Sequence, residues 1–116
     1  DQNIVFNLNG FTWNINSLVG SSGTETNGVQ LLQGSTVTIE NGTLTSKTAK
    51  LLIQNYCDLT IRNATLSGQD NLTEIIVSNN NGSTALLQAT VPFKLLRAES
   101  LLTLTNGAVI KAVTLL

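Results

Sequence analysis

The chain has 116 residues, of which 41% are hydrophobic and 11% are charged, and its formal net charge is -1. A chain of this size and apolar content can bury the core of one domain, so we take residues 1–116 as a single domain. The few charges are spread singly along the sequence, which excludes a basic patch for nucleic acid or an anionic membrane. No apolar run reaches the length of a membrane span, so membrane insertion is not expected.

The first segment, residues 4–17, alternates apolar and polar residues, and Asn9-Gly10 interrupts the alternation. This pattern predicts two short strands joined by a bend. Trp13 precedes Val37 by nearly the interval that separates the later repeats, so we expect this segment to be a first coil in register with the coils that follow. The glycine- and serine-rich stretch at 20–23 predicts a loop that projects from that coil.

A repeat dominates the middle of the chain. The pattern of residues 35–44 returns at 57–66, and a weaker copy occupies 101–109. The matched apolar positions of the first two copies are Val37, Ile39 and Leu44, followed by Leu59, Ile61 and Leu66. A repeat period of about 22 residues predicts a β-solenoid, here a parallel β-helix of about five coils.

Apolar doublets and triplets recur between these copies and predict a second strand in each coil. They are Leu31-Leu32, Leu51-Leu52-Ile53, Ile75-Ile76-Val77, Leu95-Leu96 and Leu115-Leu116. Side chains alternate in direction along a strand, so one member of each doublet is expected to face outward. The predicted outward stripe, which we interpret as an oligomer contact, is Leu31, Leu52, Ile75, Leu95 and Leu115. The alternative is that each doublet lies at a bend and both members turn inward.

Asparagines follow the inward residues of each copy at the same distance. We expect Asn41, Asn63 and Asn106 to occupy equivalent turns, because Asn tolerates the left-handed backbone region, and to form a ladder of hydrogen-bonded amides.

The side chains between the inward positions predict an outward face. This face contains the threonine column Thr38, Thr60 and Thr103. Beside it, Glu40 and Arg62 fall on adjacent coils and predict a surface ion pair worth well under ~1 kcal/mol.

The register is weakest over residues 67–92, which predict one irregular coil with enlarged turns. The next stretch, 91–100, has some helical spacing, but we favour a strand in register with Leu51 and Leu52.

Three stretches together resemble the right-handed parallel β-helix of the pectate-lyase-like superfamily. They are Leu-Asn-Gly-Phe-Thr at 8–12, Thr-Val-Thr-Ile-Glu-Asn-Gly-Thr-Leu at 36–44 and Leu-Thr-Ile-Arg-Asn-Ala-Thr-Leu at 59–66. That superfamily includes polysaccharide lyases and hydrolases, phage tailspikes and bacterial surface domains. The resemblance covers nearly the whole chain but implies only the scaffold. A different solenoid and an antiparallel β-sandwich are the alternative folds.

Candidate catalytic chemistry is sparse. The hydrolases and lyases of the resembled superfamily use clustered carboxylates with a His, or an acidic calcium site with a catalytic Arg or Lys. This chain has no His, and its seven acidic residues are scattered. We therefore expect no catalytic residues, no metal site and no cofactor. The four Asn-x-Ser/Thr sequons are about what chance provides in a chain this rich in Asn, Ser and Thr, and the single cysteine, Cys57, is interpreted as a semi-buried spectator thiol.

These observations favour a non-enzymatic structural or interaction module of an extracellular, cell-surface or virion assembly, such as a fibre, spike or adhesin stalk. We expect a homo-oligomer, with a trimer favoured, or neighbouring coils of a longer chain, because neither end has an obvious cap. Cell-surface glycans are candidate ligands of the Thr and Asn faces. The alternatives are a fragment of a carbohydrate-active β-helix enzyme and a carbohydrate-binding module, for which Trp13 and Tyr56 are the main aromatic platforms.

Overall fold

A computed structural model describes residues 2–69, 71–80 and 83–91, together with the backbone of 95–98, 101–104 and 109–110. Within this part of the chain every regular element is a β-strand, so the protein is all-β, as predicted. The strands are β1 (Asn3–Asn7), β2 (Thr12–Asn14), β3 (Val19–Ser21), β4 (Thr24–Leu31), β5 (Thr36–Thr45), β6 (Leu51–Asn55), β7 (Asp58–Leu66), β8 (Ile75–Asn79), β9 (Thr84–Val91), β10 (Leu95–Ala98), β11 (Leu101–Leu104) and β12 (Val109–Ile110).

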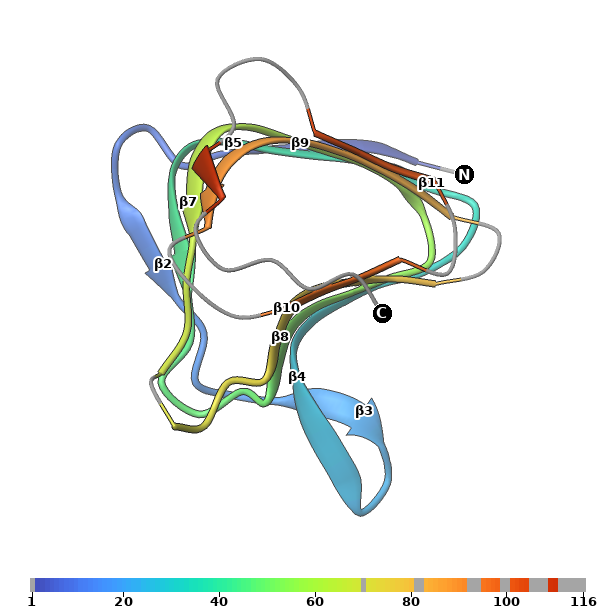
Figure 1. Ribbon diagram of the computed structural model, residues 1–116. Coiled ribbons are helices and arrows are strands. Elements are labelled where there is room, and N and C mark those ends of the chain that lie inside the picture. Colours follow the sequence, from blue (N-terminus) through green and yellow to red (C-terminus); the bar gives the residue numbers. More distant parts are fainter. Residues whose placement is uncertain are drawn as a thin grey trace.

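The strands form two sheets. Sheet A has the order β1-β5-β7-β9-β11, with β2 also paired with β5 and β12 with β9, and sheet B has the order β10-β8-β6-β4-β3. The pairs are parallel except for the antiparallel β3–β4 hairpin. From β4 to β11 the chain alternates between the sheets, and Figure 1 shows the strands arranged around a common interior. The hairpin projects from this body.

The predicted repeat sets the register of sheet A. Strand β5 pairs with β7 so that Val37 lies beside Leu59 and Ile39 beside Ile61, which confirms the predicted step between the first two copies. Each of these side chains is buried, because the alternation of a strand turns every second residue inward. The weaker third copy reaches the same column, since Leu102 of β11 pairs with Ala85 of β9, which pairs with Leu59.

The register predicted for the first segment is wrong. Trp13 pairs with Leu44 and not with Val37, whose partner is Ile4 of β1. The predicted bend at Asn9-Gly10 is present, with both residues at positive φ, and it joins β1 to β2 along the length of β5. The residues of the β3–β4 hairpin lie between β2 and β5. The number of residues from Trp13 to its partner Leu44 is therefore larger than the number from Trp13 to Val37.

Sheet B confirms the strand predicted near the end of the chain. Leu95 of β10 pairs with Ile75 of β8, which pairs with Leu51 of β6, so Leu95 lies in the predicted register. The register then shifts, and Leu96 pairs with Val77, in the column of Ile53 and not of Leu52. The irregularity predicted for 67–92 is also present. Strand β9 has one residue fewer than β7 at the position of Asn63, because Arg62 pairs with Gln88 and Ala64 with Ala89.

The core lies between the sheets. Its largest fully buried side chains come from β5 to β9: Ile39, Leu44, Leu52, Ile53, Leu59, Ile61, Leu66, Ile76, Val77, Leu87 and Val91. The first turn of the chain packs against them with residues that remain partly exposed, among them Ile4, Phe6, Trp13 and Ile15. Phe6 and Trp13 contact each other, with ring centroids 5.3 Å apart. The core side chains of β5 to β9 are therefore shielded from solvent, whereas those of β1 and β2, at one end of the core, remain partly exposed.

Candidate functional site

The predicted threonine column lies on the outer face of sheet A, but it is not continuous. Thr38 pairs with Thr60, and these two threonines are flanked by Val5 on one side and Leu86 on the other. Val5 is 57% exposed and Leu86 38% exposed. The backbone of Thr103 pairs with Leu86, so the predicted order is confirmed at the level of strand pairing. The column is half apolar and does not form a hydroxyl surface.

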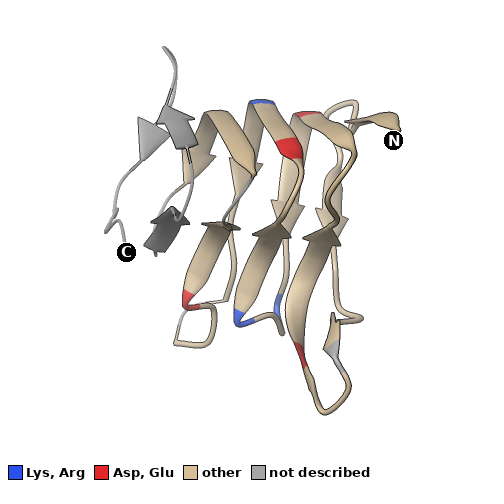
Figure 2. Ribbon diagram, turned by 90° about the vertical axis from the view of Figure 1, so that its right-hand side faces the viewer, with Lys and Arg blue, Asp and Glu red and all other residues tan. Residues whose placement is uncertain are grey.

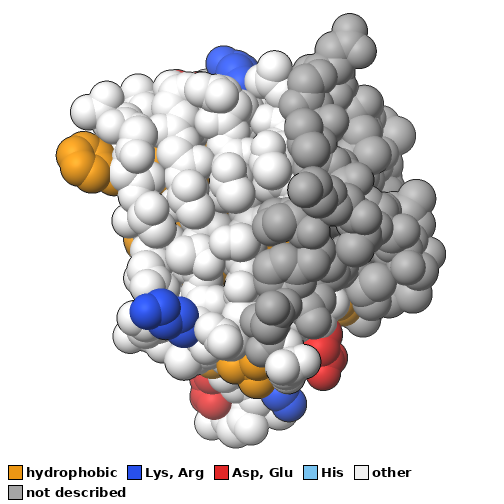
Figure 3. Space-filling model, turned by 60° about the vertical axis from the view of Figure 1, so that its left-hand side comes forward, with side chains coloured by type: hydrophobic (Ala, Val, Ile, Leu, Met, Phe, Trp, Pro, Cys, Tyr) orange, Lys and Arg blue, Asp and Glu red, His pale blue; other side chains and the backbone are white. Residues whose placement is uncertain are grey.

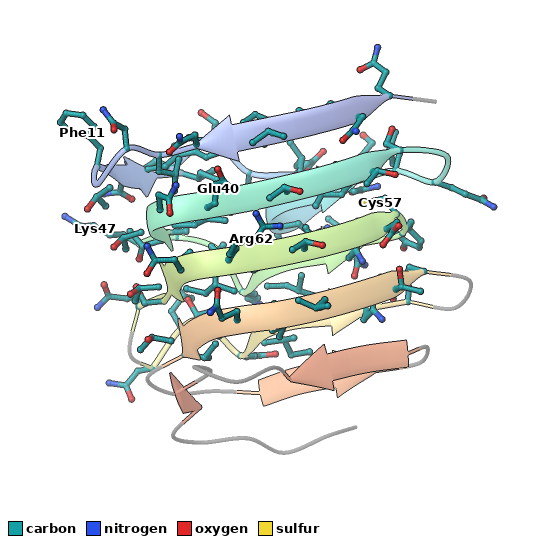
Figure 4. The ribbon with its side chains drawn as sticks, turned by 90° about the horizontal axis from the view of Figure 1, so that it is seen from above. Phe11, Glu40, Lys47, Cys57 and Arg62 are labelled. Carbon is teal, nitrogen blue, oxygen red and sulfur yellow. The ribbon has the colours of Figure 1, made fainter. Side chains whose placement is uncertain are left out.

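The predicted ion pair is confirmed. The guanidinium of Arg62 lies 3.4 Å from the carboxylate of Glu40 on the adjacent strand, and Figure 4 shows the two side chains on neighbouring rungs. The Arg62 side chain is 59% exposed and that of Glu40 is 18% exposed, so solvent screens the attraction. Arg62 and Glu40 are therefore a minor contribution to stability.

An asparagine ladder occupies the bend of the outer face, as predicted. The Nδ2 of Asn63 donates to the Oδ1 of Asn41 at 3.1 Å, and the Nδ2 of Asn41 donates to the Oδ1 of Asn7 at 3.3 Å. Asn41 and Asn63 have φ values of 63° and 49°, which is the left-handed conformation expected at this turn. Asn106, the third predicted member, lies outside the described residues. Asn7 is a member that the sequence did not predict.

Two open hollows follow this ladder. One has a volume of about 450 Å³ and is lined by Asn7, Asn9, Gly10, Asn41, Gly42, Thr43 and Asn63. The other has about 130 Å³ and is lined by Asn63, Ala64, Thr65, Gln88, Ala89 and Thr90. Amides and hydroxyls dominate both linings, and neither includes a charged residue. We call this strip the asparagine corner. Phe11, which is 71% exposed, projects from the bend between β1 and β2 (Figure 4).

The predicted outward apolar stripe is wrong for the residues that the structure describes. Leu52 and Ile75 are buried, and Leu31 packs partly buried against the core. A methyl group on Gly28 would lie 2.9 Å from the Leu52 carbonyl oxygen, so Gly28 permits a close approach of β4 to the backbone at Leu52. Leu52 and Ile53 are both fully buried, so both face the core, which was the alternative considered. Leu95 has only its backbone described, and Leu115 lies outside the described residues.

A second asparagine ladder, which the sequence did not predict, lies inside the protein. Asn55 and Asn79 are fully buried at the ends of β6 and β8, and the Nδ2 of Asn55 donates to the Oδ1 of Asn79 at 2.7 Å. Asn55 also donates to the carbonyls of Cys57 and Thr84 and accepts from the N–H of Cys57. The signal for this ladder was the return of Leu-Leu-Ile-Gln-Asn as Ile-Ile-Val-Ser-Asn one repeat later.

Cys57 lies at this buried turn, at the end of β7 opposite the asparagine corner (Figure 4). Its residue is only 3% exposed, and its Sγ lies 3.1 Å from the Oδ1 of Asn55. Burial raises the pKa of the thiol, and the negative charge of Asp58 raises it further. Both effects disfavour the nucleophilic thiolate, which agrees with the predicted spectator role.

We therefore expect Cys57 to resist a thiol reagent in the folded protein. At pH 8 the native chain should react at least ~100-fold more slowly than the same chain in denaturant, because the raised pKa and the burial act together. The measurement is the absorbance change with a chromogenic disulfide reagent. Because the thiol pKa is higher in the folded than in the unfolded state, stability should fall as the pH rises above the unfolded value of about 8.5. Equal native and denatured reaction rates would contradict this assignment.

A further hollow, here called the terminal groove, lies beside the partly exposed apolar residues Trp13, Ile15 and Val29. Its volume is about 610 Å³, and it is lined by Trp13, Asn14, Ile15, Asn16, Ser17, Val19, Gly20, Gly28, Val29, Gln30 and Leu32. None of these residues is charged. The groove separates the segment that follows β2 from the end of β4. It was not predicted, because its walls combine the end of the predicted first coil, the predicted loop at 20–23 and the doublet Leu31-Leu32, whose packing the local pattern does not give.

Charged and metal-binding chemistry is sparse on the surface. Figure 2 shows few acidic and basic residues along the ribbon, and outside the grey atoms of Figure 3 few charged side chains lie on the face that it shows. Among the described residues, no three His, Cys, Asp or Glu side chains gather to hold a metal ion. The same part of the chain contains no helix long and apolar enough to cross a membrane.

Comparison with protein families, with curated proteins and with solved structures gave no match.

Proposed function

We propose that this chain is a parallel β-helix of the kind it resembles, and that it serves as a non-enzymatic building block of an extracellular or virion-surface assembly such as a fibre, spike or adhesin stalk. The fold proposal is supported by parallel strands that alternate between the two sheets. In sheet B the paired residues Asn27, Leu51 and Ile75 are each 24 residues apart, and in sheet A Thr36, Asp58 and Thr84 follow at steps of 22 and 26 residues, whereas the first and last steps of sheet A depart further from this spacing. Steps of similar length in the middle of the chain are what one continuous coil requires.

The observation that carries the functional proposal is the distribution of exposed apolar side chains. Five large hydrophobic residues are exposed in the described part of the chain, and four of them lie in its first turn: Val5, Phe11, Val19 and Leu32. Two of these line the terminal groove. A concentration of apolar surface at one end of a stack of strands is typical of an end that other protein covers.

The engagement of the carboxylates supports a structural role for them. Glu40 binds Arg62, Asp58 accepts a hydrogen bond of 2.7 Å from the hydroxyl of Thr84, and Glu25 accepts one of 3.0 Å from the N–H of Gly23. These three groups join neighbouring strands or close the β3–β4 hairpin. Glycoside hydrolysis instead uses two carboxyl groups that face one substrate.

Sedimentation velocity over a concentration series tests the assembly. The chain should associate as its concentration rises, and Leu32→Lys should weaken the association by at least about tenfold, because it places a charge in the terminal groove. Leu86→Lys is the matched control, since Leu86 is exposed on the outer face of sheet A. A chain that remains monomeric at millimolar concentration, or equal effects of the two variants, would overturn the proposal.

The asparagine corner supports a second role, the binding of neutral glycans. Its amides and hydroxyls can donate to and accept from sugar hydroxyls, and exposed Phe11 offers an aromatic surface near it. Titration of neutral oligosaccharides into the protein should show binding that Phe11→Ala and Thr43→Val both weaken. Binding that neither substitution changes would exclude the corner as its site.

A further inference from the structure

We infer that the terminal groove is a docking site for an extended strand, one with the chemistry of β6, which runs parallel to β4 and continues sheet B by one further strand. This inference rests on the proposed assembly function and deepens it by naming the chemistry of the strand that would cover the open end; a partner supplies that strand, because β6 itself is paired on both edges. It rests on the free edge of β4, on the lining of the groove and on the way β6 occupies the opposite edge.

Strand β4 is paired along its whole length on neither edge, and part of its edge opposite β6 has no described strand beside it. On one side β4 pairs with β6, from Asn27 to Leu31. On the other side β3 pairs only with Thr24–Asn27, and no described strand continues the sheet from Gly28 to Leu31. The sheet therefore stops partway along one of its strands.

The direction of the backbone groups shows what this edge can bind. The carbonyl of Leu31 accepts a hydrogen bond of 2.8 Å from the N–H of Tyr56, so the polar groups of Leu31 face β6. Along a parallel strand, the N–H and C=O of one residue point to the same side, and those of the next residue point to the other. Both backbone groups of Gln30 consequently point into the terminal groove, where they present one donor and one acceptor to an incoming strand.

The side chains of the groove set the second requirement. Val29 packs partly buried against the core, and Trp13 and Ile15 approach it from the other wall. A docked strand would place one side chain above Val29, in the column that continues through Ile53 and Val77. That column is apolar in every described strand, so the docked side chain should be apolar too. Since no charged residue lines the groove, a charged side chain there would be desolvated without a partner.

The sequence of β6, Leu-Leu-Ile-Gln-Asn, meets these requirements and already pairs with β4 in parallel on its other edge. The probe is a peptide with this sequence flanked by lysines for solubility. Its apolar isoleucine is replaced by lysine in a control peptide. Trp13 is the only tryptophan of the chain and lines the groove, so its fluorescence reports occupancy directly.

We expect the β6 peptide to shift the Trp13 emission to shorter wavelength in a saturable way, and the control peptide to bind at least about tenfold more weakly. Gln30→Pro removes the N–H that faces the groove without breaking a bond to β6, and it should weaken peptide binding about tenfold. Gln30→Ala keeps that N–H and should bind as the parent does. In both Gln30 variants, slow reaction of the buried Cys57 with a thiol reagent serves as the control that the protein is folded.

Amide hydrogen exchange and a spin label complete the test. Exchange of the Gln30 N–H should slow when the peptide binds, and a label on the amino end of the peptide should broaden resonances near Asn27 more than those near Leu32. No fluorescence shift at saturating peptide, equal binding to Gln30→Pro, or broadening centred on Leu32 would overturn the inference. The peptide-binding experiments use dilute, monomeric protein. If the chain binds the peptide but does not self-associate in sedimentation, the assembly proposal is refuted and the docking inference is retained.

Discussion

Asn55→Leu is expected to lower the free energy of unfolding by about 3 kcal/mol, although leucine is more apolar and the site is fully buried. The Asn55 side chain makes five hydrogen bonds: it donates to the carbonyls of Cys57 and Thr84 and to the side-chain oxygen of Asn79, and it accepts from the N–H and the thiol of Cys57. Leucine cannot replace them, and burying such groups without partners costs about 1–3 kcal/mol each. Urea denaturation followed by circular dichroism gives the change.

Asn14→Leu is the matched control for this substitution. Asn14 is exposed at the end of β2, so the same chemical change there should alter stability by less than about 0.5 kcal/mol. The comparison separates the effect of the buried ladder from that of adding a leucine. If the two variants have the same unfolding midpoint, the hydrogen bonds of Asn55 do not stabilise the turn between the sheets.

Ile61→Ala should destabilise the protein by about 2–5 kcal/mol. Ile61 is fully buried between Ile39 and Leu87 of the adjacent strands, so its truncation leaves a cavity that the neighbouring rungs can fill only by breaking their register. The urea midpoint should fall with little change in the slope of the transition, as expected for lost packing.

Thr60→Ala tests the alternation of faces in the same strand. Thr60 is the preceding residue, points outward and is only partly buried, so its replacement should cost under about 1 kcal/mol. A larger loss for Thr60→Ala than for Ile61→Ala would mean that β7 presents its other face to the core.

The local pattern was sufficient to predict the middle of the fold. Ile39 and Ile61 are spaced by the repeat and alternate with polar residues, so strand class, register and inward direction all followed. The bend at Asn41 and Asn63 followed for a similar reason, because Asn favours the backbone conformation needed there. Both inferences use only neighbours in sequence and one repeat length.

The errors arose where distant segments decide the outcome. Leu52 faces the core together with the next residue, Ile53, beside Gly28 of the neighbouring strand β4, and alternation along one strand cannot show that. Trp13 was displaced from its predicted partner because the β3–β4 hairpin lengthens the first turn. Asn55 and Asn41 are the same residue type at two turns, and only the tertiary fold places one inside and the other at the surface.

The stacking of the two repeat copies, 35–44 and 57–66, is the claim on which the proposals depend, and a disulfide across two rungs tests it directly. In a Cys57→Ser background, Thr38→Cys with Thr60→Cys places two thiols on paired residues, where parallel strands lie about 4.8 Å apart and a disulfide fits. Thr38→Cys with Arg62→Cys offsets the second thiol by two positions, to about 8 Å, which is too far. We expect rapid intramolecular oxidation of the first pair only, measured by intact mass and electrophoretic mobility. Equal oxidation of both pairs, or faster oxidation of the offset pair, would contradict the stacked register.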